Sequence, residues 1–177
     1  MARLILTFED VAAGALKGAG LADCVIPFGL RFVWGQLQSP TALETFLSPR
    51  SAAHAAPDCY WLDNLTGRGL DEARTDGLGL IELCERFDAV ELWADPEPNA
   101  QLQLVWLLDH LRPHANVISR SALVHPDTRI GNHRPAEWVA SRPAAVQIRK
   151  DHLEAARAAW AAWRRTNAGR LARFVGA

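Results

Sequence analysis

The chain has 177 residues, a mass of 19.5 kDa, 49% apolar and 22% charged side chains, and a net charge of −1. This size and composition are typical of one globular domain with its own core, and they exclude a wholly disordered chain. The small net charge hides an asymmetry, because residues 1–128 hold 9 basic and 17 acidic side chains (−8), whereas residues 129–177 hold 10 and 3 (+7).

The first thirty residues predict a strand, a helix and a second strand. The apolar run 4–8 is typical of a strand buried in a parallel sheet. Asp10 can cap a helix over residues 11–19, and residues 24–26 form the second strand, which Pro27 ends. This arrangement predicts a compact strand–helix–strand unit.

The middle of the chain is less regular. Ser39, followed by a proline, predicts the start of a helix. Residues 48–69 carry Pro, Gly, Ser and Asp and predict a loop. A longer helix is predicted over residues 70–87, although Gly77 and Gly79 each cost it about 1 kcal/mol.

The clearest unit is a strand over residues 89–93, a helix over residues 98–112 that Pro113 ends, and a strand over residues 116–119. Such short joints predict a right-handed crossover between parallel strands. No strand is expected after about Ser121.

The rest of the chain predicts helices. A loop over residues 122–134 precedes a short helix that Pro135 begins. Asp151 and Glu154 resemble a capping box at the start of a last long helix, which ends near residue 167. Its apolar stripe is Leu153, Ala156, Trp160 and Trp163, and a last turn or two would hold Leu171, Phe174 and Val175.

These patterns predict the α/β class, with a mostly parallel, three-layer arrangement around a sheet of about four strands. Residues 1–121 form this domain, and residues 122–177 form a helical C-terminal extension packed on it. The three cysteines, Cys24, Cys59 and Cys84, show no CxxC spacing and are interpreted as reduced thiols. The apolar N-terminal run is too short for a signal peptide, and no stretch spans a membrane, so we expect a cytoplasmic protein.

Acidic side chains follow the strands of the predicted sheet. Parallel sheets bind ligands at the carboxyl ends of their strands, so this edge is the candidate site for a small polar ligand. Its residues are Asp10, Asp95, Glu97 and Gln101, with Trp93 as a wall. The alternative is that Asp10 and Asp95 only cap helices, which is the commoner role.

Other chemistry has little support in the sequence. No GxGxxG or phosphate-binding loop follows the first strand, so a standard dinucleotide site is not expected. Asp109, His110 and His114 are spaced like metal ligands, but Pro113 separates them, and no metal site is predicted. No nucleophile motif is present, so the catalytic residues, any cofactor and the question whether the protein is an enzyme stay open.

The basic C-terminal segment has two interpretations. Its arginines Arg164, Arg165, Arg170 and Arg173, beside Trp160 and Trp163, could contact phosphates with the rings stacking on bases. The alternative is a docked helix whose tryptophans lie in the core and whose arginines face solvent or the acidic body. Helical spacing favours the docked helix, so nucleic acid is not the expected partner.

Several stretches carry a family resemblance: Leu6-Thr7-x-x-Asp10-x-Ala12-Ala13, Val25-Ile26-Pro27, Leu92-Trp93 with Gln101-Leu102-Gln103-Leu104, and residues 129–175. They resemble an uncharacterised bacterial family, domain of unknown function 1835. The chain departs from the family at Phe8-Glu9 (Asn-Gly in the family), at residues 28–30 (Trp-Arg-Asp) and at residues 95–97 (Glu-His-Asp). The resemblance implies an intracellular α/β protein with an altered or inactive version of the family's polar site, and it implies no reaction.

The leading functional hypothesis is therefore the binding of a small polar ligand at the strand ends. An alternative is a non-catalytic interaction or regulatory module, including a homodimer, in which the seven tryptophans supply the interface. Nucleic-acid binding through the basic segment is the weaker alternative.

Overall fold

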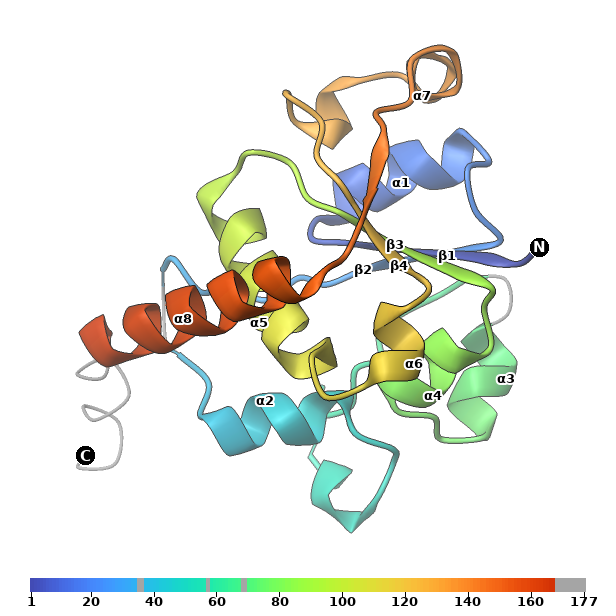
Figure 1. Ribbon diagram of the computed structural model, residues 1–177. Coiled ribbons are helices and arrows are strands. Elements are labelled where there is room, and N and C mark those ends of the chain that lie inside the picture. Colours follow the sequence, from blue (N-terminus) through green and yellow to red (C-terminus); the bar gives the residue numbers. More distant parts are fainter. Residues whose placement is uncertain (35–36, 57, 68–69, 168–177) are drawn as a thin grey trace.

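A computed structural model describes residues 1–34, 37–56, 58–67 and 70–167. Its centre is a five-stranded sheet in the order β2-β1-β3-β4-β5 (Figure 1). The strands are β1 (Arg3–Thr7), β2 (Cys24–Pro27), β3 (Ala89–Trp93), β4 (Ser121–Val124) and β5 (Ala145–Gln147). Four are parallel and β5 runs antiparallel to β4, so the mostly parallel sheet that the sequence predicts is confirmed with a fifth strand added.

Helices cover both faces of the sheet (Figure 1). One face carries α1 (Asp10–Gly18), the 3-10 turn η2 (Ile130–Asn132) and α7 (Pro135–Ala140). The opposite face carries α2 (Pro40–Leu47), α3 (Leu70–Thr75), α4 (Leu80–Glu85), α5 (Pro98–Leu111), α6 (Ala115–Ile118) and α8 (Lys150–Thr166), and the 3-10 turn η1 (Ala52–His54) lies near α2. The predicted α/β class is therefore confirmed.

The pleat of the strands divides the core into two parts. In β1, Leu4 and Leu6 pack in the larger core beneath α5, whereas Ile5 packs in the smaller core beneath α1. Neighbouring side chains of a strand point to opposite faces, so a continuous apolar run is needed where both faces are covered. In β3 the same alternation puts Leu92 in the larger core and Trp93 in the smaller one.

The helix predicted over residues 70–87 is two helices, α3 and α4. Gly77 has a φ of +65°, which side-chain-bearing residues rarely adopt, and Leu78 N–H donates to the carbonyl of Ala73. At Gly79 a Cβ atom would lie 2.8 Å from Cδ of Pro49. The two glycines therefore end α3 and let the chain pass close to the preceding loop.

The prediction of a strand over residues 116–119 is wrong. These residues form the short helix α6, and the fourth strand is Ser121–Val124 instead. A two-residue apolar pair such as Val117 and Ile118 fits a buried helical turn as well as a strand. The expectation that no strand follows Ser121 is also wrong, because β4 and the exposed edge strand β5 lie beyond it.

The last long helix, α8, begins at Lys150, one residue before the predicted cap Asp151. Arg149 occupies the N-cap position of α8, so Asp151 is its second residue and not its cap. The predicted apolar stripe is confirmed, since Leu153, Ala156 and Trp160 are buried and Trp163 packs against the same core. The predicted last turn with Leu171, Phe174 and Val175, like Arg170 and Arg173, lies outside the described residues.

Within the part of the chain that the structure describes, no helix is both long and apolar enough to cross a membrane. Cys24, Cys59 and Cys84 are all free thiols. Burial raises the pKa of Cys24 to about 11 and that of Cys84 to about 12, so both stay protonated at neutral pH.

We expect the thiol reagent DTNB to label about one cysteine of the native protein at pH 8, because only Cys59 is partly exposed and thiolates are the reactive form. Titration in denaturant should give all 3 thiols. The variant Cys59→Ser should lose the native reaction, and fast labelling of that variant would contradict the burial of Cys24 and Cys84.

Candidate functional site

The predicted site lies where the strand order reverses, between β1 and β3. These strands are parallel, and Thr7 at the end of β1 pairs with Trp93 at the end of β3. Doubly wound sheets bind ligands at such a switch point. Asp10 and Asp95 follow these two strands, so both lie at the same edge of the sheet.

Asp95 is buried at this edge, with 2% of its surface exposed. Its Oδ1 accepts a hydrogen bond from the N–H of Glu97 (3.3 Å), and its Oδ2 accepts one from the N–H of Ile130 (3.2 Å). Gln101 Nε2 donates to the backbone carbonyl of Asp95 (2.7 Å). The carboxylate therefore joins the start of α5 to the loop that follows β4.

Asp10 and Asp95, which were expected to cap helices, do not occupy the N-cap positions. Glu9 is the N-cap residue of α1 and Glu97 that of α5, and neither side chain makes a capping hydrogen bond. Asp10 is the first residue of α1 and is exposed, where its charge still favours the positive end of the helix dipole.

Arg129 closes the edge from the loop after β4. Its guanidinium lies 2.9 Å from Oε1 of Glu9 and 3.4 Å from Oε1 of Glu97. At the same edge lies a hollow that leaves no room for a water molecule, and its lining consists of Thr7, Phe8, Glu9, Ala12, Trp93, Asp95 and Ala100. The structure thus brings Trp93, Asp95 and Glu97 together with Gln101 beside them, while Asp10 points to an exposed position on α1.

The predicted wall residue Trp93 also belongs to a group of ion pairs around the buried Glu91. Its Nε1 donates to Oε2 of Glu91 (2.9 Å), and its ring meets the ring of Trp138 edge-on at 5.7 Å. Glu91 pairs with Arg3 at 3.3 Å and with Arg142. This group ties the middle of β3 to the N-terminal strand and to the segment that follows α7.

Gln103 has a role that the sequence analysis missed. Its side chain is fully buried, its Oε1 accepts from the N–H of Leu30 (3.1 Å), and its Nε2 donates to the carbonyl of Phe8 (3.3 Å). An amide can do both because it has a donor and an acceptor end. A glutamine among the apolar residues of a buried helix was the available signal.

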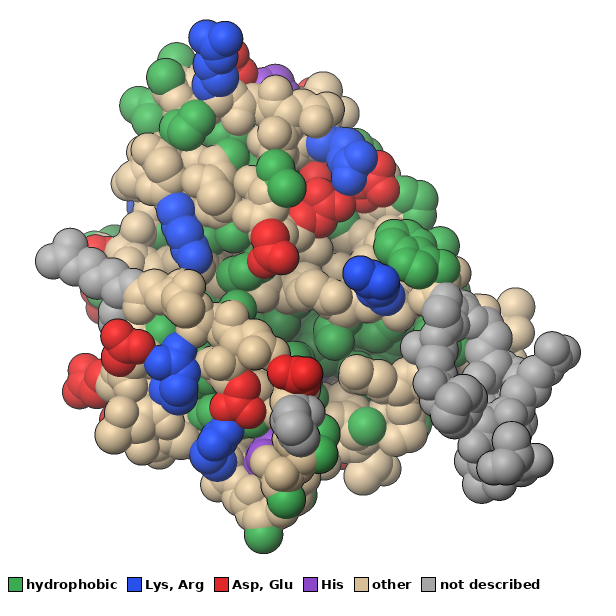
Figure 2. All heavy atoms as spheres, turned by 180° about the vertical axis from the view of Figure 1, so that it is seen from behind, with side chains coloured by type: hydrophobic (Ala, Val, Ile, Leu, Met, Phe, Trp, Pro, Cys, Tyr) green, Lys and Arg blue, Asp and Glu red, His purple; other side chains and the backbone are tan. Residues whose placement is uncertain are grey.

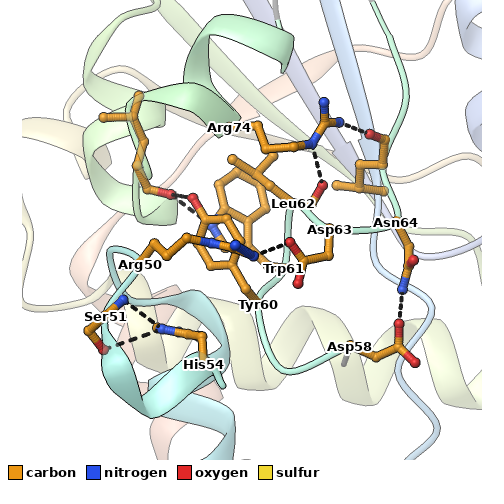
Figure 3. A network of polar contacts seen from close by, with 12 residues as sticks. Arg50, Ser51, His54, Asp58, Tyr60, Trp61, Leu62, Asp63, Asn64 and Arg74 are labelled. Carbon is orange, nitrogen blue, oxygen red and sulfur yellow. Dashed lines mark hydrogen bonds and ion pairs between the residues drawn. The ribbon is translucent and has the colours of Figure 1, made fainter. Parts of the chain in front are cut away.

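A second polar network organises the segment between α2 and α3 (Figure 3). Arg50 lies over the ring of Tyr60, with 4.6 Å from its Cζ to the ring centroid, and pairs with Asp63. Tyr60 Oη and Trp61 Nε1 both donate to the carbonyl of Leu78 (2.5 and 3.0 Å). These bonds satisfy groups of the loop and of the turn between α3 and α4, so the network has a structural role.

His54 belongs to the same segment. Its Nδ1 accepts from the N–H of Ser51 (3.0 Å), which leaves Nε2 to carry the proton and donate to the carbonyl of Thr45 (2.7 Å). Figure 3 shows Ser51 and His54 facing each other across this short turn. The segment predicted as loop therefore contains one 3-10 turn, η1, and is held by side chains.

An open groove lies between α5 and α8. Its volume is about 470 Å³, and it is lined by Asp109, Arg112, Arg157, Trp160, Ala161, Arg164 and Arg165. Four arginines against one aspartate give the lining a charge of +3. Small-molecule sites have volumes of roughly 300–1,000 Å³, so the groove has a suitable size.

The arginines of α8 in this groove have no partner in the part of the chain that the structure describes. Arg112 pairs with Asp109 at 3.3 Å, whereas Arg157, Arg164 and Arg165 have no ion pair or hydrogen bond within the described ranges. Arg164 and Arg165 stand out in the sequence, but their position beside Asp109 and Arg112 of α5 does not. That contact between α5 and α8 depends on the tertiary packing.

The basic segment contacts the acidic body at two other arginines. Arg129 and Arg142 reach glutamates of residues 1–128. On the face shown in Figure 2, acidic and basic side chains lie interspersed among apolar ones. Within the described ranges no group of three His, Cys, Asp or Glu side chains could hold a metal ion.

The chain matches no protein-family model and no curated protein. The resemblance to domain of unknown function 1835 therefore stays a prediction that rests on the quoted residues.

Proposed function

We propose that the protein binds a small polar ligand, and that this ligand is an anion held in the groove between α5 and α8. The observation that supports this most directly is that Arg157, Arg164 and Arg165, which have no partner among the described residues, share one open hollow. Like charges repel one another, and a bound anion relieves this repulsion. The planar guanidinium also matches carboxylate and phosphate geometry, since it can donate two parallel hydrogen bonds.

The wall of the groove suits a ligand of limited size. Trp160 is 7% exposed and forms part of the lining, and Ala161 leaves space beside it. Because Trp160 is buried against Phe32 and Trp163, its ring is not free to stack on a nucleic-acid base. This favours a small anion over the nucleic-acid alternative.

The interaction-module alternative has less support. Five of the seven tryptophans, Trp61, Trp93, Trp106, Trp138 and Trp160, are buried inside the protein. Interface anchors need exposure in the free protein. Trp34, with 53% of its surface exposed, is the tryptophan that fits such a role best.

Calorimetric titration with inorganic pyrophosphate at low ionic strength tests the proposal. We expect Arg157→Gln and Arg164→Gln each to weaken binding about tenfold, because each removes a charge-assisted contact. Arg149→Gln is the matched control, since Arg149 lies at the start of the same helix, is 69% exposed at its side chain and does not line the groove. The control should bind within about twofold of the unmodified protein.

Equal binding by all four proteins would overturn the proposal, as would an absence of binding to pyrophosphate and to citrate. Binding of a single-stranded oligonucleotide without binding of either small anion would also overturn it and favour the nucleic-acid alternative.

The strand ends are a second candidate, favoured by their place at the switch point between β1 and β3. The hollow at the strand ends has no free room. A ligand there would therefore have to displace Arg129 from Glu9 and Glu97. Binding that Glu97→Gln abolishes and Arg164→Gln leaves intact would support this position instead.

A further inference from the structure

A smaller cleft adjoins the groove on the side of α2. Its volume is about 170 Å³, and its lining consists of Pro40, Leu43, Glu44, Trp106, Asp109, His110, Trp160 and Arg164. Asp109, Trp160 and Arg164 also line the groove, so the two hollows share a border. In Figure 1, α2, α5 and α8 lie together on this side of the sheet.

The two hollows differ in the sign of their charge. The groove has four arginines and one aspartate, whereas the cleft has Glu44 and Asp109 against Arg164. His110 adds no charge at neutral pH, because burial and the neighbouring His114 lower its pKa from the ordinary value of 6.5. A positive region therefore borders a negative one across Asp109.

His110 also leaves a polar atom without a partner. Its Nε2 is buried and makes no hydrogen bond within the described part of the chain. An unsatisfied buried nitrogen costs roughly 1–3 kcal/mol, so a group that bonds to it would be stabilising. A neutral imidazole nitrogen that carries no proton can accept such a bond from an N–H donor.

We propose that the ligand is a zwitterion, with its anionic group among Arg157, Arg164 and Arg165 and an ammonium group in the cleft beside Glu44 and Asp109. This inference rests on the proposed function, since it assigns the second charge of the same ligand. Carboxylates attract an ammonium group directly, and Glu44 and Asp109 both line the cleft. Aminoalkyl phosphates and related amino acids belong to this chemical class.

The test compares two probes that differ in the ammonium group alone, phosphoethanolamine and ethyl phosphate. We expect the unmodified protein to bind phosphoethanolamine about tenfold more tightly, because one added charge-assisted contact has about this effect. Glu44→Gln should reduce the ratio of the two affinities to about 1. Glu72→Gln, at an exposed glutamate of α3 that does not line either hollow, should keep the ratio near ten.

The outcomes separate this inference from the proposed function. Equal affinities for the two probes, with pyrophosphate still bound, would overturn the zwitterion and leave the anion groove intact. A tenfold ratio that persists in Glu44→Gln would overturn the assignment of the ammonium group to the cleft. No binding of pyrophosphate or of either probe would overturn the groove itself.

Discussion

Replacing Glu91 by alanine is expected to lower the free energy of unfolding by about 3 kcal/mol. The Glu91 side chain is 7% exposed and accepts from Trp93 Nε1 while it pairs with Arg3 and Arg142. Alanine would leave a buried indole N–H unpaired and two guanidinium groups without their counter-charge. Urea denaturation followed by tryptophan fluorescence would measure the loss.

Two further variants make this measurement specific. Glu91→Gln keeps the shape and one acceptor oxygen, so it should cost only about half as much. Glu72→Ala removes an exposed glutamate and should change the stability by less than about 0.5 kcal/mol. A Glu91→Ala protein as stable as the Glu72→Ala protein would show that the buried group contributes nothing.

Replacing Asp95 by alanine is expected to cost about 2–3 kcal/mol. Its two carboxylate oxygens accept from the backbone N–H groups of Glu97 and Ile130, and the bond to Ile130 is buried. Without the carboxylate, the buried N–H of Ile130 has no acceptor. Thermal and urea unfolding of the purified variant would both report the loss.

Asp10→Ala is the matched control, because Asp10 lies at the same edge of the sheet but is exposed. It should stay within about 0.5 kcal/mol of the unmodified protein. Residues kept for function often reduce stability, so an Asp95→Ala protein that is more stable than the original would favour a binding role for Asp95 over a structural one.

The elements with long apolar signals were the ones that the sequence predicted well. The runs that became β1, β3 and α5 are buried on most sides, and such burial requires continuous apolar residues whatever the rest of the chain does. Short elements gave weaker signals. β5 is an exposed, three-residue edge strand, so its sequence carries no apolar run that could identify it.

The candidate site also has parts that the sequence could predict and parts that it could not. The strand-end residues could be predicted together because parallel strands end at one edge. Asp95 and Trp93 do line one hollow there, and the backbone N–H of Glu97 bonds to Asp95. The ion pairs of Arg129 with Glu9 and Glu97 could not be predicted, since they depend on where the loop after β4 returns to the sheet. The groove between α5 and α8 depends likewise on how two distant helices cross.

The sequence by itself determined the α/β class, the mostly parallel sheet and the division of charge between residues 1–128 and 129–177, because these follow from local periodicity and composition. Only the tertiary structure decided which of the basic side chains form ion pairs. Arg129 and Arg142 pair with glutamates of the acidic body, whereas Arg157, Arg164 and Arg165 lie beside α5 with no partner among the residues that the structure describes. The reason is that salt screens exposed charges more than about 10 Å apart, and the distances between charges are set by the packing of segments far apart in the chain.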